Sequence, residues 1–292
     1  LSLSSIFYSE SYQVELVLQP KFSPNRIPYA EDDFPLAPDL KPNINHKIEN
    51  ETEYGFRFQT SLLDSDVSFS FFNGIDRIPS VFKGAFSSDF KESTFDLGYR
   101  KTSVYGTDLV SFIGDFTLRA EGALYRTINK PIEDDKESLK YLLNQEIIYS
   151  QFVVQFEYTT ENDLMLSAQF IGNELINNKS NWVVPESNEP MELPIPEFSP
   201  GMGTPFAMFT DRALLVSSSG VLMDDQLDIS GSIMTNLSET GLMISAGIGY
   251  SPILNWKIEL ATTQFKGNES PINPFTLMED FSHIRWGLLY NF

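Results

Sequence analysis

The sequence predicts an all-β protein, a transmembrane antiparallel up-and-down β-barrel of about 14 to 18 strands. Three observations lead to this fold class. Apolar side chains recur at every second position along most of the 292 residues, which is the period of a strand with one apolar and one polar face. Helical periodicity is almost absent. The connections alternate between short and long, as they do when a membrane separates turns from loops.

Thirteen strands follow from this period. The clearest alternation places Phe152, Val154, Phe156 and Tyr158 on one face, opposite polar residues. Residues 93–113 are expected to form one long strand, and Gly114-Asp115 a tight turn after it. The full set of expected strands is 1–8, 12–19, 54–62, 67–71, 93–113, 116–125, 148–158, 164–171, 213–218, 227–234, 242–250, 256–265 and 281–292.

The last twelve residues, FSHIRWGLLYNF, carry the strongest pattern. Ile284, Trp286, Leu288, Tyr290 and Phe292 share one face, and lipid is the expected cover for it. The segment resembles the closing strand of bacterial outer-membrane β-barrels. That resemblance implies an outer-membrane location, lipid and the barrel-assembly machinery as partners, and an assembly signal made of Trp286, Leu288, Tyr290 and Phe292.

Composition excludes several other classes. No apolar run approaches the roughly twenty residues of a transmembrane helix. The chain has no Cys, so it forms neither a disulfide nor a thiolate metal site. With 40 Asp and Glu against 20 Lys and Arg, its formal charge of −20 argues against nucleic acid as a partner. No basic-then-apolar leader is present, which fits a mature or truncated chain.

Short connections are expected at 10–11, 64–66, 114–115, 161–163, 219–225 and 251–255, and long loops at 20–51, 73–92, 127–145, 172–205 and 266–280, with 236–241 as a short member of the second set. The whole chain, 1–292, is expected to form a single barrel domain. Residues 24–42 and 183–200 are rich in Pro and acids, so they are expected to be solvated loops, or loops folded into the barrel to narrow it. Single-chain bacterial barrels usually have an even strand number. Thirteen strands therefore predict at least one strand before Leu1, or a partner at that edge.

If the apolar faces meet lipid, the polar faces line the lumen. Charges of both signs are expected there, where they orient solutes or pair with one another to hold the wall. The expected lumen-lining residues are Glu15, Arg57, Arg119, Glu121, Glu157, Asp228, Lys257, Glu259 and Arg285.

Aromatic residues near strand ends are expected to form girdles at the membrane boundary, with a carbohydrate-stacking track as the alternative. These residues include Tyr99, Tyr125, Tyr158, Tyr250, Trp256 and Tyr290.

The sequence offers little to catalysis, metal binding or cofactors. His46 and His283 are the only histidines, and Ser282 points away from its neighbour His283, so a nucleophile and base pair by adjacency is not expected. The acidic runs 31–33 and 133–135 lack EF-hand spacing. Gly247-x-Gly249 lies within a strand, where it favours close packing over nucleotide binding. No enzyme activity, metal or cofactor is therefore expected.

Beyond the closing strand, the segments DFTLRAEGALY (115–125) and 256–292 are similar to porin-like outer-membrane proteins, including those near alginate exporters. The resemblance implies a passive conduit for small hydrophilic solutes. The alternative is a plugged structural or assembly barrel whose long loops bind a partner protein or a surface polymer. A protein partner or a homo-oligomer is also expected. An outer-membrane lipase using His283 is the third hypothesis.

Overall fold

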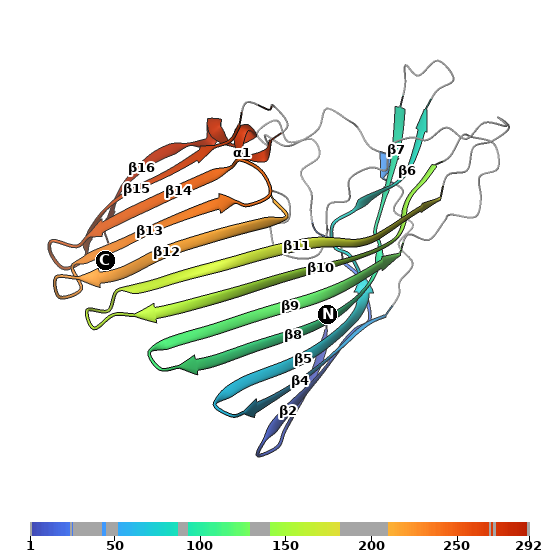
Figure 1. Ribbon diagram of the computed structural model, residues 1–292, viewed down its shortest axis with the longest axis horizontal. Coiled ribbons are helices and arrows are strands. Elements are labelled where there is room, and N and C mark those ends of the chain that lie inside the picture. Colours follow the sequence, from blue (N-terminus) through green and yellow to red (C-terminus); the bar gives the residue numbers. More distant parts are fainter. Residues whose placement is uncertain are drawn as a thin grey trace.

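The computed structural model describes residues 2–23, 25, 43–44, 52–86, 93–128, 141–181, 210–268, 270 and 273–290. Their architecture is one curved antiparallel sheet (Figure 1). Thirteen strands follow one another in a single hydrogen-bonded path, in the order β1-β2-β4-β5-β8-β9-β10-β11-β12-β13-β14-β15-β16. The path confirms an all-β up-and-down fold and the expected number of thirteen main strands.

The strands of this path have the following bounds: β1 Leu3–Tyr8, β2 Tyr12–Gln19, β4 Glu53–Leu62, β5 Ser65–Ile75, β8 Lys101–Ile113, β9 Phe116–Ile128, β10 Tyr141–Thr159, β11 Met165–Asn181, β12 Arg212–Leu222, β13 Leu227–Asn236, β14 Leu242–Tyr250, β15 Trp256–Lys266 and β16 His283–Tyr290. Helices are confined to α1 Pro274–Leu277 and the 3-10 turn η2 Glu279–Phe281 among the described residues. None of these described helices is long and apolar enough to cross a membrane.

The expected long strand 93–113 is wrong. It divides into β7 (Ser93–Gly98) and β8, with Tyr99 and Arg100 between them. β7 leaves the main path and pairs with β6 (Ser80–Phe86) and β3 (Asn43–Ile44), while β6 also pairs with the far end of β10. The expected loop 73–92 therefore contains a strand. The alternation of Phe95, Leu97 and Tyr99 continues up to the break and does not reveal it.

Tight turns join the strands in pairs at one end of the sheet, which we call the turn end. At this end Leu63 and Asp64 both have positive φ, of 49° and 60°, as a type I′ hairpin requires. Gly114 has φ 61° at the first central position of the next two-residue turn, where glycine carries no steric penalty. The connection 237–241 and the described residues of 267–282 lie at the opposite end, the loop end (Figure 1).

The observed strands are longer than predicted at several points. β12 continues to Leu222, which shortens the expected connection 219–225 to four residues, 223–226. β11 continues to Asn181, which removes its first part from the expected loop 172–205. The Pro-rich stretches 24–42 and 183–200 lie outside the described residues.

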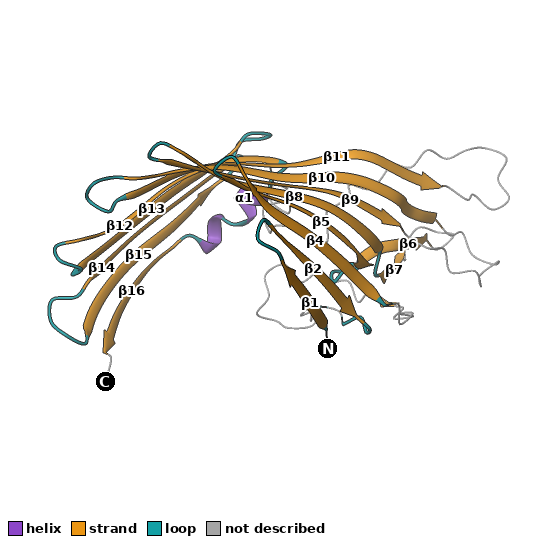
Figure 2. Cartoon of the chain, turned by 90° about the horizontal axis from the view of Figure 1, so that it is seen from below, coloured by secondary structure: helices purple, strands orange, loops and turns teal. Residues whose placement is uncertain are grey.

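The sheet bends into an arch with β1 and β16 at its two edges (Figure 2). No pairing joins these two edges within the described residues. Because each strand alternates its side chains, one set of residues points to the convex side and the other into the hollow of the arch, the concave face.

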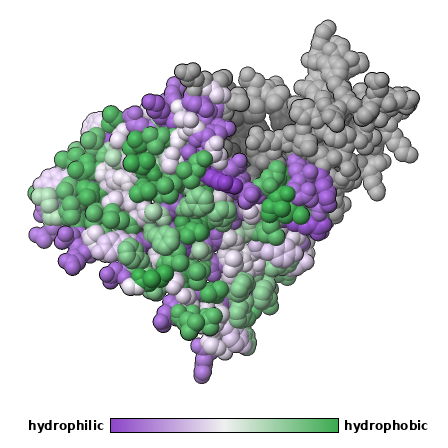
Figure 3. All heavy atoms as spheres, viewed as in Figure 1, coloured by the Kyte–Doolittle hydropathy of each residue, from purple (hydrophilic) through white to green (hydrophobic). Residues whose placement is uncertain are grey.

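The convex face is apolar. Figure 3 shows this side, with hydrophobic residues spread across the strands. Exposure is high for large side chains such as Trp286 (78%) and Ile284 (71%). Other exposed members, spread over ten strands, are Leu16, Phe56, Phe69, Tyr105, Leu124, Phe156, Val216, Ile233, Ile244, Ile248, Ile258 and Leu260.

Charged residues bound the convex apolar band at the loop end. On β9 the outward positions run from Phe116 to Leu124, about nine residues, which is the length a tilted membrane strand requires. The next outward residue is Arg126, whose guanidinium contacts Glu146 at 2.8 Å. Lys179 contacts the same carboxylate at 2.9 Å. The band thus ends where paired charges begin.

Candidate functional site

The concave face carries all nine polar residues predicted for the lumen. Register places them on one side of the sheet, since Glu15 faces Arg57 across β2 and β4, and Arg57 faces Ser70 across β4 and β5. The same alternation continues to Arg285 on β16, which faces Ala261.

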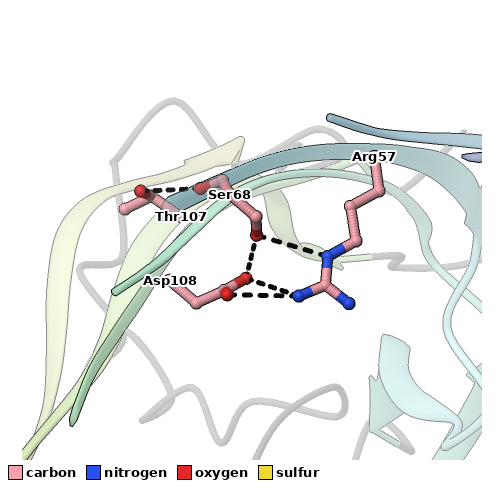
Figure 4. A network of polar contacts seen from close by, with 4 residues as sticks. All are labelled: Arg57, Ser68, Thr107 and Asp108. Atoms are coloured by element: carbon pink, nitrogen blue, oxygen red, sulfur yellow. Dashed lines mark hydrogen bonds and ion pairs between the residues drawn. The ribbon is translucent and has the colours of Figure 1, made fainter. Parts of the chain in front are cut away.

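The first cluster joins three strands through one arginine (Figure 4). Arg57 on β4 donates to both carboxylate oxygens of Asp108 on β8, each at 3.1 Å, and its Nε donates to Ser68 Oγ at 3.2 Å. Ser68, fully buried on β5, donates in turn to Asp108. The backbone carbonyl of Ser68 accepts from Thr107 on the convex side at 3.0 Å, which fixes the central strand.

Asp108 and Glu121 face each other directly across β8 and β9. Like charges in such a pair repel. The two hydrogen bonds from Arg57 Nη2 offset this repulsion by compensating the charge of Asp108. Glu15, on the other side of Arg57, accepts a hydrogen bond from Ser4 Oγ at 2.9 Å. This half of the concave face therefore carries charges of both signs.

A second cluster lies on β9 and β10. Arg119 Nε donates to Glu157 Oε2 at 3.0 Å, and Gln155 donates to Glu157 Oε1 at 2.6 Å. Arg119 is half exposed, so the ion pair contributes little to stability and leaves the guanidinium open to solvent.

A third cluster lies near the opposite edge. Lys257 on β15 reaches over β14 to Asp228 at 2.7 Å and also contacts Glu259 at 3.3 Å. Gly249 stands between Asp228 and Glu259, and a Cβ there would lie 2.7 Å from the lysine Cε. Glycine thus makes room for the lysine to cross the strand. The close packing expected for Gly249 has this local cause.

Small hydroxyl residues fill the wall between the charged clusters. One register row contains Ser167, Ser217, Ser232, Ser245 and Thr263, on five successive strands. Ser232 and Ser245 lie 2.8 Å apart through their hydroxyls, and Ser167 and Ser217 lie 3.2 Å apart. The concave face therefore has a charged half and a mostly neutral half.

An inward-folded segment covers part of the neutral half. Phe275 of α1, 1% exposed, packs against Ala213 and Met234 on the concave side, with Leu215, Met243 and Phe265 around them. Figure 2 shows α1 inside the arch. Gly241 permits the approach, since a Cβ there would meet the phenyl ring at 2.4 Å. The expected loop 266–280 thus lies partly against the sheet wall.

Asn273 holds this segment in place. Its Oδ1 accepts from the backbone N–H groups of Phe275 and Thr276, which caps α1, and its Nδ2 donates to Glu239 Oε2 at 3.2 Å and Thr240 O at 3.0 Å. One amide side chain therefore starts the helix and ties it to the β13–β14 connection.

A buried ionic cluster lies at the loop end of the sheet, beside β5 and β8. Glu53, fully buried, accepts from Arg77 at 2.5 and 2.7 Å and from the Ile75 backbone N–H at 2.8 Å. The Arg77 guanidinium also lies 4.8 Å from the ring centroid of Phe22, a cation–π contact.

Asp76 and Arg100 are also fully buried in this region. Burial raises the pKa of the Asp76 carboxyl, against the opposing effects of the Ile78 backbone N–H and of Arg100. Burial lowers the pKa of Arg100 to about 10, although Asp76 acts against this. No motif in the sequence indicates this cluster, because its residues lie in an expected loop and an expected strand.

The prediction of an aromatic girdle position is wrong for Tyr99 and Tyr125. Tyr125 lies on the concave face and stacks on Tyr149, with ring centroids 4.6 Å apart. Tyr99 lies between β7 and β8 and contacts Phe22. At the turn end, Tyr158 does contact Phe116, with centroids 5.0 Å apart, on the convex side. The strand β9 runs three residues beyond Tyr125, so that residue is not at a strand end.

At β15 and β16, Trp256 lies 4.9 Å from Tyr290 between ring centroids. Tyr250, at the end of β14, is 40% exposed on the convex side. Within the described part of the closing strand, Trp286, Leu288 and Tyr290 all face the convex side and are exposed. Phe292 lies outside the described residues.

The side chains of His283 and Ser282 make hydrogen bonds to two different backbone groups. His283 Nδ1 donates to Phe281 O at 2.8 Å, while Ser282 Oγ accepts from Phe265 N at 3.0 Å. His46 and the acidic runs 31–33 and 133–135 lie outside the described residues. Within the part of the chain that is described, no group of three His, Asp or Glu residues could hold a metal.

Neither the models of known protein families nor the curated protein sequences match this chain.

Proposed function

We propose that this protein is a porin-like channel of the bacterial outer membrane that passes small hydrophilic solutes down their gradient. In this proposal the curved sheet closes as a transmembrane barrel whose convex side meets lipid. The observation that carries it is the contrast between the two faces of one sheet, apolar and exposed outside, polar and charged inside.

The exposure of the convex face supports lipid as its cover. Leaving a side chain such as Ile284 or Leu288 in water forgoes about 1.5–3 kcal/mol of burial each, and such residues recur on nearly every strand. The band ends at Arg126 on the loop side and at aromatic contacts such as Phe116–Tyr158 on the turn side. This sequence of features is typical of a membrane-spanning barrel.

The concave face supports passage of solutes rather than a chemical reaction. Arg57 with Asp108, Arg119 with Glu157 and Lys257 with Asp228 present paired charges on different strands. Such groups create a transverse field that orients polar solutes without binding them tightly.

Single-channel recording in planar bilayers tests the proposal. The purified protein in detergent is added to one side of the bilayer in KCl, and discrete current steps of uniform size are expected. A channel that stays silent at every voltage would contradict the proposal, and so would a protein that is monodisperse in buffer without detergent.

A second candidate function is a plugged structural or assembly barrel that binds a partner protein or a surface polymer through its long loops. The packing of Phe275 against Ala213 and Met234 favours it, because this contact brings a loop-end segment into the concave space. The same bilayer recording separates the two, since a plugged barrel carries no current.

A further inference from the structure

The outward positions of the thirteen main strands, those that face the convex side, carry more cations than acids. Five of these outward residues are Lys or Arg and two are Glu, although the whole chain has 40 Asp and Glu against 20 Lys and Arg. A surface with the average composition of the chain would show the opposite excess. The seven outward charges, which we call the basic rim, are Lys101, Arg126, Glu146, Glu174, Lys179, Arg212 and Lys266.

The basic rim follows the strand ends at the loop end of the sheet. Arg212 begins β12 and Lys266 ends β15 (Figure 1). Arg126 and Lys179 each lie two residues before the last residue of their strands, β9 and β11. These positions border the convex apolar band. In the proposed barrel they therefore lie where the strands leave the hydrocarbon and enter the headgroup layer.

The cations of the basic rim are open to their surroundings. The side chains of Arg126, Lys179 and Arg212 are 54%, 61% and 56% exposed. Glu146 contacts both Arg126 and Lys179, so one carboxylate compensates two cations only in part. Glu174 lies 4.0 Å from Arg212. The rim thus keeps a net positive charge that a further anion can compensate.

A hollow of about 650 Å³ lies at the β15 side of the basic rim. Lys266 lines it together with the β13–β14 connection, 237–241, whose serine and threonine carry hydroxyl groups. The acid in this lining, Glu239, accepts a hydrogen bond from Asn273 Nδ2 at 3.2 Å and is engaged by it. A space of this volume can hold a polar group of the size of a lipid headgroup.

The turn end of the sheet has the opposite charge. Its six described connections, 9–11, 63–64, 114–115, 160–164, 223–226 and 251–255, carry seven acids and neither Lys nor Arg. Anionic headgroups are repelled by such turns and attracted by the basic rim, since basic residues near a membrane surface bind anionic lipid. The acids are Glu10, Asp64, Asp115, Glu161, Asp163, Asp224 and Asp225.

We infer that the basic rim binds the phosphate groups of anionic lipids in the leaflet at the loop end, and that Lys266 and its hollow hold one headgroup. This inference rests on the proposed function, because it requires lipid against the convex face, and it names the class of lipid. Cations that border a lipid-facing band meet headgroups directly, which favours a lipid phosphate over a soluble one.

Native mass spectrometry of the protein in a neutral detergent tests this inference. Phosphatidylglycerol is added in one series and phosphatidylcholine with the same acyl chains in another, and the dissociation constants of the bound lipids are measured. Phosphatidylglycerol is expected to bind more tightly. The triple variant Lys179→Gln, Arg212→Gln and Lys266→Gln is expected to weaken phosphatidylglycerol binding about tenfold or more, with phosphatidylcholine binding unchanged.

The matched control removes the same number of cations from the concave face, by Arg119→Gln, Lys257→Gln and Arg285→Gln. Its phosphatidylglycerol binding is expected to equal that of the unmodified protein, although both triple variants change the net charge equally. Circular dichroism identifies folded protein. Should the rim variant not fold, Lys266→Gln alone changes one exposed side chain and is expected to weaken phosphatidylglycerol binding about fivefold.

Three results would overturn the lipid site. These are equal affinity for the two lipids, equal phosphatidylglycerol binding in the rim variant and the unmodified protein, and an equal loss in the concave control. Displacement of phosphatidylglycerol by inorganic phosphate would assign the rim to a soluble anion and overturn it as well.

The bilayer recording keeps the two proposals apart. Channel current together with any of these results would overturn the lipid site and leave the channel in place. A protein that carries no current but prefers phosphatidylglycerol through the rim would overturn the channel and leave the lipid site in place.

Discussion

Truncation of Phe275 is expected to release the segment 267–282 from the concave face. The side chain is 1% exposed and forms the centre of the cluster with Ala213 and Met234. Replacing a buried Phe by Ala costs about 3–5 kcal/mol. The remaining ties are weaker, since the two hydrogen bonds from Asn273 Nδ2 contribute about 1 kcal/mol each.

A four-residue helix has no stability of its own, so α1 depends on these contacts. Hydrogen exchange followed by mass spectrometry in detergent measures its release. In Phe275→Ala, exchange at the amides of Leu277 and Met278 is expected to accelerate by about a hundredfold or more, since 3 kcal/mol corresponds to roughly two powers of ten. The core of β13 and β14 is expected to stay protected.

Leu277→Ala serves as control, because this leucine belongs to the same helix but is 52% exposed. Its exchange is expected to match that of the unmodified protein. Equal exchange in Phe275→Ala and Leu277→Ala would refute the reasoning that this aromatic contact holds the segment against the wall.

Three further predictions follow from the faces and the buried charges. Ile244→Lys puts a charge on the convex face and is expected to lower the free energy of unfolding in lipid vesicles by about 2–4 kcal/mol. The control is Ser245→Lys, at the neighbouring position on the concave face, which is expected to change this free energy by less than about 1 kcal/mol. Equal effects of the two substitutions would contradict a lipid-facing convex side. Arg57→Ala leaves the Asp108 carboxylate without its cationic partner, so the reversal potential in a KCl gradient is expected to shift toward cation selectivity. The free energy of unfolding is expected to change little, because the ion pair is partly exposed. An unchanged reversal potential would exclude this pair from the solute path. Asp76 lies outside the main strands and has a pKa above its ordinary value of 3.8, so the folded state holds the carboxyl proton at higher pH than the unfolded state does. The free energy of unfolding should therefore fall as the pH rises from about 3.8 through the raised pKa. Urea titrations at several pH values measure this fall, and Asp76→Asn should lack the part that Asp76 causes.

The faces of the strands were predictable because alternation is a local property. Glu15, Arg57, Arg119 and Glu157 lie on the concave face as the period of two requires. The tight turn at Gly114 was also predictable, since glycine adopts positive φ without strain.

The pairing of these charges was not predictable from periodicity. Arg57 meets Asp108 from a strand 51 residues away, and the contact depends on the register of β4, β5 and β8. Lys257 pairs with Asp228 only because Gly249 leaves space over β14.

The sequence by itself determined the all-β class, the thirteen main strands and the two-sided character of the sheet, because each depends on neighbours within a few residues of one another. The tertiary structure decided the break at Tyr99 and Arg100, the inward packing of Phe275 and the buried position of Asp76. These features depend on long-range contacts, in which residues far apart in the chain exclude water from one another, and alternation carries no information about which strands meet.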